Sequence, residues 1–594
     1  MFKMKCKQYK YTIAFFAILF CYYQYCIRRA YGFTFFPDEF GYWTYAAKAA
    51  GYDWSEITAL GSYYSYGYSL ILFPIFLLCK NAVMAYRIAV TMNFILLGVT
   101  YFVLLTLGKR LLLLKDGNIQ TDEHLLQIST TIAVFYPSWL FYARSTMVEV
   151  LLMTIFVVIC FLMYHYLENN RLVSLILLVI SLVYIHFLHM RAIGVLAAGA
   201  VTLLCSFFLH RKDGEKEKKK NHILLFLCLG IAALALGFFI KNKIEATLYA
   251  GAGEATFAIN DYAGQLDKVR YLFTKDGLEN LICGLAGKLL YMGCATFGLA
   301  FWGIAYTIRK VCNKTEKKEK RLFSLFVLLA SFAELAINTI YNIYPIRVDS
   351  VTYGRYHEFV FPVLMILGLY EMKQTKKKNL LTGTVVILAA QIPLVMLTLQ
   401  SIQKYQLTNF HGYVMVGMSY FYNSENINIE GLYWITFAVC AAVTLLLTLI
   451  MIVIQRDSKS FQFVLVVMIG IEIILSMKAS TLYIEPSARG AFRDTFVVEK
   501  IEQLKQEDTD RNIVFIAEQE DTLVSILQFM MREQEIHVLP VREEVEAYAE
   551  EELSQDDIVI LDYRSEYGTE IEKKYQQRFS NGHFIVYYNE KRNE

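Results

Sequence analysis

The chain has 594 residues, 56% of them hydrophobic and 19% charged, with a formal net charge of +3. Its mean hydropathy is +0.39. A composition this apolar excludes an ordinary soluble domain or a disordered protein, and the near-neutral charge gives no reason to expect a nucleic-acid partner.

Apolar runs long enough to cross a membrane recur along most of the chain. A hydrocarbon core of about 30 Å needs about 20 apolar residues in a helix. Because every backbone amide in lipid must be paired internally, we predict a polytopic α-helical membrane protein. About thirteen transmembrane helices are expected, and they begin near Tyr11, Ala82, Leu125, Met147, Leu172, Ala192, Ile223, Leu281, Leu322, Tyr356, Leu380, Gly431 and Phe461.

The distribution of Lys and Arg predicts the orientation. Four lysines precede the first span, so we expect a cytoplasmic N-terminus and a retained anchor, since no small-residue cleavage site follows. The 11 cysteines all precede residue 441, which favours a bacterial plasma membrane over a secretory pathway. Alternate loops are basic, at Lys109–Arg110, His210–Lys220, Arg309–Arg321, Lys373–Lys378 and Arg456 with Lys459.

Three predicted outer loops are longer than a turn requires. The first runs from about residue 28 to 80 and ends in an apolar stretch, Tyr66–Leu78. That stretch is short for a span, so we expect a helix lying in the membrane interface. The second loop runs over Lys241–Asn280 and the third over Ser401–Glu430.

The tail after about Ser480 differs in composition, with 13 Lys and Arg against 26 Asp and Glu. An odd number of spans places it outside the cell. Alternating strands and helices predict a small α/β domain with a parallel sheet. The strands are expected at Asn512–Ala517, Ile536–Val541, Asp557–Tyr563 and Phe584–Tyr588, and the helices at Thr522–Met531, Glu543–Glu552 and Glu570–Phe579.

No glycine-rich turn follows the first of these strands, and the acids of Glu518–Asp521 argue against a bound nucleotide phosphate. We therefore predict two parts. Residues 1–479 form a transmembrane catalytic domain, and residues 480–594 form an extracytoplasmic accessory domain.

The adjacent acids Asp38 and Glu39, just beyond the first span, are the leading candidates for chemistry. Transfer of a sugar to a hydroxyl needs a general base, and it needs positive charge or a metal for the departing phosphate. A purely structural interpretation remains open. Asp38 would then cap a helix beginning near Phe40, with Glu39 in its first turn.

Further ionisable residues are expected on the same outer side, which suggests one polar cavity opening there. For several, a structural role is also open: interface anchoring for Arg144 and Arg191, and burial for His186. Intramembrane Glu334 and Glu472 fit either an ion path or pairing with arginines. The outer-side candidates are Arg144, Glu149, His186, His189, Arg191, Lys288, Arg355, Tyr356 and His357.

Over roughly residues 1–400 the chain resembles the GT-C superfamily of membrane glycosyltransferases, and looks closest to bacterial relatives of the protein O-mannosyltransferases and aminoarabinose lipid A transferases. Four features carry the resemblance, and all follow the order of the spans. They are Asp38-Glu39 in the first outer loop, the interfacial helix followed by Tyr86-Arg87, Pro137 with Arg144 and Glu149, and Gly354-Arg355-Tyr356 with Pro362.

The resemblance implies a polyprenyl-phosphate sugar donor, transfer with inversion and a cell-envelope acceptor. Asp38 matches the catalytic acidic position, with Glu39 assisting it or helping to hold a divalent cation such as Mg²⁺ or Mn²⁺. Arg191 and Arg355 would hold the donor phosphate. The extra spans and the acidic tail depart from better-known relatives and leave the acceptor open.

Three alternatives predict different residues. A transporter or flippase of lipid-linked sugar or polymer would rely on Glu334 and Glu472, and would often show repeated halves. A polymerase or ligase of another membrane fold would use a large later loop. A non-catalytic scaffold would tolerate Asp38→Asn.

Overall fold

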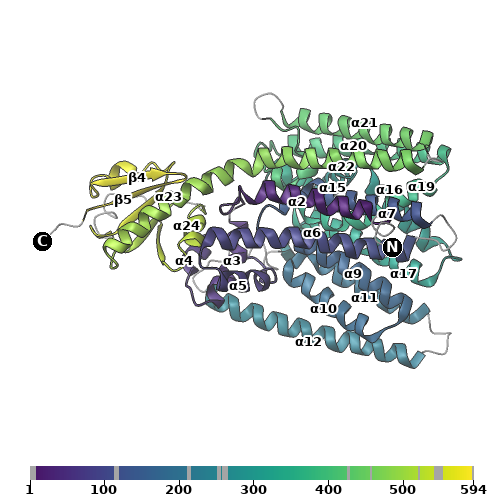
Figure 1. Cartoon of the computed structure of the whole chain (residues 1–594), viewed down its shortest axis with the longest axis horizontal. Coiled ribbons are helices and arrows are strands. Elements are labelled where there is room, and N and C mark those ends of the chain that lie inside the picture. Colours follow the sequence, from purple (N-terminus) through teal and green to yellow (C-terminus); the bar gives the residue numbers. More distant parts are fainter. Residues whose placement is uncertain are drawn as a thin grey trace.

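The computed structural model describes residues 8–35, 37–112, 119–209, 216–249, 256, 265–423, 428–454, 458–518, 522–540 and 553–590. The molecule is elongated, with a bundle of long helices at one end and a small sheet at the other (Figure 1). The short helices of the first outer loop lie between these two parts.

Among the described residues the bundle has one helix more than the thirteen predicted spans, because the chain between Leu281 and the basic loop at Arg309–Arg321 forms two helices. In chain order the bundle helices are α2 (Lys10–Ile27), α6 (Ala82–Leu112), α7 (Ile119–Phe135), α9 (Glu149–Asn169), α10 (Leu172–Leu188), α11 (Ile193–Leu209), α12 (Lys216–Leu248), α15 (Lys275–Ala295), α16 (Leu299–Cys312), α17 (Lys318–Tyr341), α19 (Phe361–Gln374), α20 (Lys377–Lys404), α21 (Ile429–Ile454) and α22 (Ser458–Tyr483). Among the described residues, 7 helices are long and apolar enough to cross a membrane, or up to 8 if the pair α15 and α16, bent by 105°, counts as one span. The prediction of a polytopic helical membrane protein is confirmed.

One predicted span begins later than expected. Tyr356 was expected to open it, but two short 3-10 turns, η2 (Gly354–Tyr356) and η3 (Glu358–Val360), come first. Helix α19 starts at Phe361, with Pro362 in its first turn, where a missing N–H costs nothing. The irregular backbone before it is what places Arg355 at the site described below.

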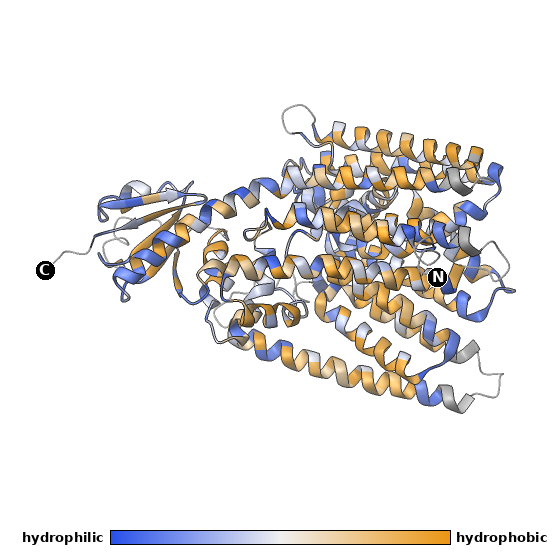
Figure 2. Cartoon of the chain, viewed as in Figure 1, coloured by the Kyte–Doolittle hydropathy of each residue, from blue (hydrophilic) through white to orange (hydrophobic). Residues whose placement is uncertain are grey.

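Hydrophobic residues dominate the long helices of the bundle, and hydrophilic residues gather at its ends and on the sheet (Figure 2). Large exposed hydrophobic side chains such as Phe20, Ile231 and Val453 would form an unfavourable surface in water. In lipid the same surface is matched to its surroundings. Which end faces the cytoplasm stays a prediction.

The first outer loop folds into three short helices, α3 (Asp38–Ala49), α4 (Ser55–Ala59) and α5 (Ser69–Leu78). Helix α5 lies within the stretch Tyr66–Leu78 where a helix was expected, and its place in the membrane interface stays a prediction. Helix α3 begins two residues before Phe40, and its N-cap is Pro37, with no side-chain capping bond. Asp38 therefore does not cap the helix, and its carboxylate is directed elsewhere.

The chain leaves the bundle along a nearly continuous helix. Only Ile484 separates α22 from α23 (Glu485–Glu507), which carries the chain to the sheet (Figure 1). The remaining elements are β1 (Ile513–Ala517), α24 (Ser525–Met530), β2 (Ile536–Pro540), β3 (Ile558–Asp562), α26 (Gly568–Ile571), β4 (Gln577–Asn581) and β5 (Phe584–Tyr588).

The sheet has the order β2-β1-β3-β5-β4. Strand β1 pairs in parallel with β2 and β3, as predicted, but β5 is antiparallel to both β3 and β4. The predicted all-parallel sheet is therefore wrong, and so is the predicted helix Glu570–Phe579, which ends at Ile571 and gives way to a strand. The predicted helix Glu543–Glu552 lies outside the described residues.

A tight turn explains this error. Gly582 and His583 form the two-residue loop between β4 and β5, since Asn581 pairs with Phe584, and Gly582 has a φ of 55°. A two-residue hairpin of type II′ needs positive φ at its first central residue, a position that favours glycine. The hairpin forces antiparallel pairing at this edge of the sheet.

Candidate active site

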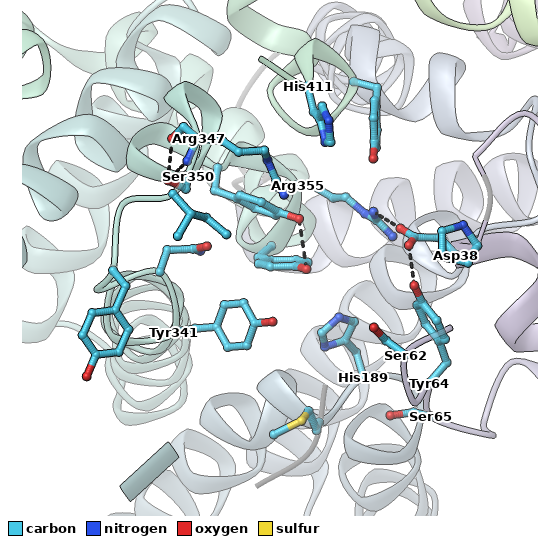
Figure 3. A pocket seen from close by; sticks show the side chains of 18 of the residues that line it. Asp38, Ser62, Tyr64, Ser65, His189, Tyr341, Arg347, Ser350, Arg355 and His411 are labelled. Carbon is cyan, nitrogen blue, oxygen red and sulfur yellow. Dashed lines mark hydrogen bonds and ion pairs between the residues drawn. The ribbon is translucent and has the colours of Figure 1, made fainter. Parts of the chain in front are cut away.

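A cavity of about 470 Å³ lies where the first outer loop meets the ends of several bundle helices. Its walls come from segments far apart in the sequence: the start of α3, the chain before α5, the turn η1 (Met190–Ala192), helix α14 (Gln265–Tyr271), the end of α17 and the segment around His411. Figure 3 shows the side chains that point into it.

Asp38 is the one carboxylate among the described residues that line this cavity. Its Oδ1 accepts a hydrogen bond from the Tyr64 hydroxyl at 2.5 Å, and its Oδ2 accepts one from Arg355 Nη1 at 2.5 Å (Figure 3). Burial and the neighbouring Asp38 raise the pKa of Tyr64 well above its usual value, so the phenol keeps its proton and donates it. The Asp38 side chain is 22% exposed, so an acceptor hydroxyl can reach it.

Arg355 bridges two carboxylates. Its Nη1 contacts Asp38, and its Nε donates to Glu149 Oε1 at the first residue of α9. The side chains of Arg355 and Glu149 are each 4% exposed. A buried partner fixes the plane of the guanidinium, so Arg355 presents a set of donors with a defined direction to the cavity.

Arg191 stands behind the cavity wall between two aromatic rings. Its guanidinium carbon lies 3.5 Å from the ring centroids of both Tyr341 and Tyr356. Its backbone N–H donates to His189 Nδ1 at 3.4 Å. Tyr341, Tyr356 and His189 line the cavity, so the charge of Arg191 acts on it through these rings.

Two further cations line the cavity from other outer segments. Lys268 on α14 lies 4.1 Å from the Tyr341 ring centroid, and burial together with Arg191 lowers its pKa to about 8. Arg347 pairs with Asp349, with Nη2 to Oδ2 at 3.0 Å. The cavity walls therefore combine one carboxylate with several positive charges.

Glu39 has a different environment from its neighbour. Its Oε1 accepts from the Thr34 N–H at 2.6 Å, the Thr34 hydroxyl at 3.1 Å and the Phe35 N–H at 2.9 Å. Its Oε2 accepts from the Tyr86 hydroxyl at 2.9 Å, the Thr146 N–H at 2.6 Å and the Thr146 hydroxyl at 2.7 Å. The side chain is fully buried and ties the first loop to α6 and to the turn before α9.

Three other candidate residues are not among the described residues that line the cavity. Arg144 Nη2 pairs with Glu485 at the start of α23, at 2.8 Å. Lys288 is buried and donates to the carbonyls of Ser350 and Val351 at 3.3 and 3.1 Å. His357 Nδ1 lies 2.8 Å from Asn338 Nδ2.

The remaining candidates are also buried away from the described lining. His186, Glu334 and Glu472 are all among the buried residues, and no ion pair is recorded for either glutamate within the described chain. Neither glutamate is among the described residues that line the cavity.

Sequence reasoning missed most of the residues that line the cavity, among them Tyr64, Lys268, Arg347 and His411. Tyr64, Lys268 and His411 lie in the three predicted long loops, and Arg347 lies just before the predicted start of a span near Tyr356. His411 donates its backbone N–H to Asp349 Oδ1 at 2.8 Å, which anchors the third loop beside Arg347. The usable signal was ionisable or tyrosine side chains in loops on the same predicted side.

The two adjacent acids do not fit a shared metal site. Both oxygens of Asp38 already accept hydrogen bonds, and Glu39 is held by six donors on the other side of the helix start. Among the described residues, no group of three or more His, Cys, Asp and Glu side chains could hold an ion. The expected divalent cation stays a prediction that these two side chains do not favour.

The whole chain matches solved membrane proteins in fold. ArnT from Cupriavidus metallidurans in the apo state has a TM-score of 0.52 at 12% identity, over 97% of each chain. The same protein bound to undecaprenyl phosphate has a TM-score of 0.53 at 11% identity, over 98% of each chain. The arabinosyltransferase EmbB from Mycobacterium smegmatis has a TM-score of 0.41 at 13% identity, over 82% of this chain and 42% of its own.

No protein-family model matches the sequence, and a search of curated proteins gives no match. The fold likeness nonetheless spans nearly all of both chains, including the C-terminal sheet. The expected likeness in fold is confirmed: the chain shares the fold of ArnT. The fold class, a polytopic helical bundle with a small C-terminal sheet, is confirmed with it.

Proposed function

We propose that this chain is an integral-membrane glycosyltransferase that moves a sugar from a polyprenyl-phosphate donor to a cell-envelope acceptor, on the outer face of the membrane and with inversion. One observation carries the proposal: a single accessible carboxylate, Asp38, faces a cavity whose other charged walls are cationic. A solved protein of the same fold binds undecaprenyl phosphate, which supports a lipid phosphate as the donor class.

Asp38 is assigned the role of general base. Its carboxylate takes the proton from the acceptor hydroxyl while the acceptor oxygen bonds to the anomeric carbon. The bond from that carbon to the phosphate oxygen breaks, and its electron pair stays on the phosphate. Attack and departure on opposite faces of the sugar invert the anomeric centre.

Arg355 has a second role in this scheme. A donor phosphate beside Asp38 would be a second anion for the same guanidinium, which Glu149 keeps in place from behind. As charge develops on the leaving phosphate, Arg355 and the nearby Lys268 stabilise it. The fixed orientation means that little reorganisation is needed at that moment.

The test is sugar transfer in proteoliposomes. Radiolabelled polyprenyl-phosphate sugars would be supplied with a cell-envelope acceptor extract, and wild type compared with Asp38→Asn. Loss of a general base should lower the rate by on the order of 10²- to 10⁴-fold. The matched control is Asp53→Asn in the same loop, whose side chain is 47% exposed and pairs with Lys48 at 3.1 Å.

The outcomes separate the candidate functions. Transfer that collapses only in Asp38→Asn supports the enzyme and its base, and the active label names the donor sugar. Transfer that is equal in both variants would remove Asp38 from the mechanism. No transfer with any donor, together with movement of labelled lipid between leaflets, would replace the proposal with a transporter.

A further inference from the structure

The C-terminal domain touches the loop that carries Asp38 at several points, and one arginine binds the end of a helix there. Arg532 follows α24, and its side chain extends to the end of α5. Its Nη1 donates to the Cys79 carbonyl at 2.5 Å, and its Nη2 donates to the Phe76 carbonyl at 2.7 Å. The residue is 7% exposed, so these bonds are shielded from water.

These contacts complete the end of a helix. The last carbonyls of an α-helix have no partner within it, and a cation there also matches the negative end of its dipole. Arg532 provides both, and its guanidinium carbon lies 3.8 Å from the Phe76 ring centroid. In the opposite direction, the Arg532 carbonyl accepts from Trp54 Nε1 at 3.0 Å, which adds α4 to the same joint.

A second contact lies on α24 itself. The Phe529 ring lies 4.5 Å from Phe33 and 5.0 Å from Trp43, measured between centroids. Trp43 Nε1 donates to the Thr146 hydroxyl at 3.0 Å, and that hydroxyl donates to Glu39. The tail thus reaches α3 through buried groups that end one residue from Asp38.

The joint is therefore connected to the proposed base by two routes. One runs from Arg532 through α5, whose Ser69 hydroxyl donates to the Tyr42 carbonyl of α3 at 2.5 Å. The other runs from Phe529 through Trp43 and Thr146 to Glu39. Both end on α3, the helix whose first residue is Asp38.

We propose that Arg532 is a positioning residue for the transfer reaction, and that through it the C-terminal domain holds Asp38 in register with Arg355. The proposal rests on the proposed function. Asp38 must lie within hydrogen-bond reach of the acceptor, and small displacements of a catalytic group cost large factors in rate. Arg355 and Lys268, the cations proposed to bind the phosphate of the sugar donor, lie on other segments. We therefore expect them to keep their places when the contacts of Arg532 are lost.

The experiment compares Arg532→Ala and Arg532→Lys with wild type in the full-length protein. The control is Val559→Ala on β3. Val559 belongs to the hydrophobic cluster on the opposite face of the sheet, so its truncation should weaken the domain without removing a contact of Arg532. Transfer kinetics are measured in proteoliposomes, and hydrogen exchange is measured in the same preparations over residues 38–80 and over β1, β3 and β5.

In Arg532→Ala we expect a fall in kcat of at least tenfold, donor KM within about twofold of wild type, and faster exchange over residues 38–80 with the strands still protected. Arg532→Lys should restore part of the kcat, because an ammonium keeps the positive charge but lacks the planar fork that directs two donors at two carbonyls. Val559→Ala should keep wild-type kcat and loop exchange.

Two results would overturn the proposal: equal kcat losses in Arg532→Ala and Val559→Ala, or unchanged loop exchange in Arg532→Ala. If wild type transfers no sugar, the proposed function fails, and the exchange data still decide whether Arg532 fixes the loop.

Discussion

Asp38 and Arg355 lie 317 residues apart and meet at 2.5 Å in the wall of one cavity. The first belongs to the loop after the first span, and the second to the irregular turns before α19. Helix ends from opposite parts of the chain therefore build a single charged site, and the variants below test its parts separately.

Glu39→Gln should damage the fold, whereas Asp38→Asn should damage only the chemistry. The Glu39 carboxylate accepts six hydrogen bonds, and an amide would turn an N–H₂ group toward donors. We expect the free energy of unfolding to fall by about 3 kcal/mol, because each hydrogen bond to a charged group contributes about 1.5–3 kcal/mol. Thermal unfolding in detergent checks this. Equal melting temperatures for Glu39→Gln and wild type would contradict the structural role of Glu39.

Glu149→Gln should weaken donor binding, because the amide no longer fixes the charge and plane of Arg355. We expect the donor KM to rise about tenfold, which corresponds to about 1.4 kcal/mol. The control is Glu168→Gln on the same helix. Glu168 Oε2 lies 3.3 Å from Arg110 Nη1, and the Glu168 side chain is 40% exposed. A donor KM that changes equally in both variants would refute the assignment.

The pH dependence of donor binding should reflect the protonation of the Lys268 amine. Its pKa of about 8 lies below the usual value, so the amine is charged below that pH and neutral above it. We therefore expect kcat/KM to fall as the pH rises through about 8. Lys268→Arg should keep activity to higher pH, and Lys275→Arg, on an exposed residue of α15, should leave the profile as it is. A wild-type profile that is flat from pH 7 to 9 would count against a role for Lys268.

Chelation should leave transfer intact. The two adjacent acids face different partners, and Asp38 alone faces the cavity, so a divalent cation has no pair of carboxylates to hold it. Activity measured after EDTA treatment, with and without added Mg²⁺ or Mn²⁺, checks this. Loss of activity on chelation and its return with metal would restore the metal to the mechanism.

The sequence was sufficient for the bundle and for the leading residue of the site. Apolar runs and alternating basic loops report on lipid exposure, which acts on every residue of a span, so the helices were predictable. Asp38 was found because a charged pair beside a span is rare in so apolar a chain. Helix α5 was predictable as a short apolar helix from its length and composition.

The rest depended on long-range contacts. Nothing local distinguishes Tyr64 from other tyrosines of the chain, and its importance comes from the hydroxyl that it directs at Asp38. Arg347 and His411 acquire their places through Asp349, which holds both. The β4–β5 hairpin was the exception, because Gly582, the first residue of its two-residue loop, carries a local turn signal that was missed.

The joined helices α22 and α23 link the bundle directly to the C-terminal sheet. The Ile484 N–H donates to the Ser480 carbonyl, and the Ala488 N–H donates to the Ile484 carbonyl. The helical hydrogen-bonding pattern therefore continues through the junction. The 23 residues of α23 then set both the height and the rotational phase of the sheet, at about 1.5 Å and about 100° per residue. One inserted residue would turn Arg532 away from α5, whatever the linker's composition.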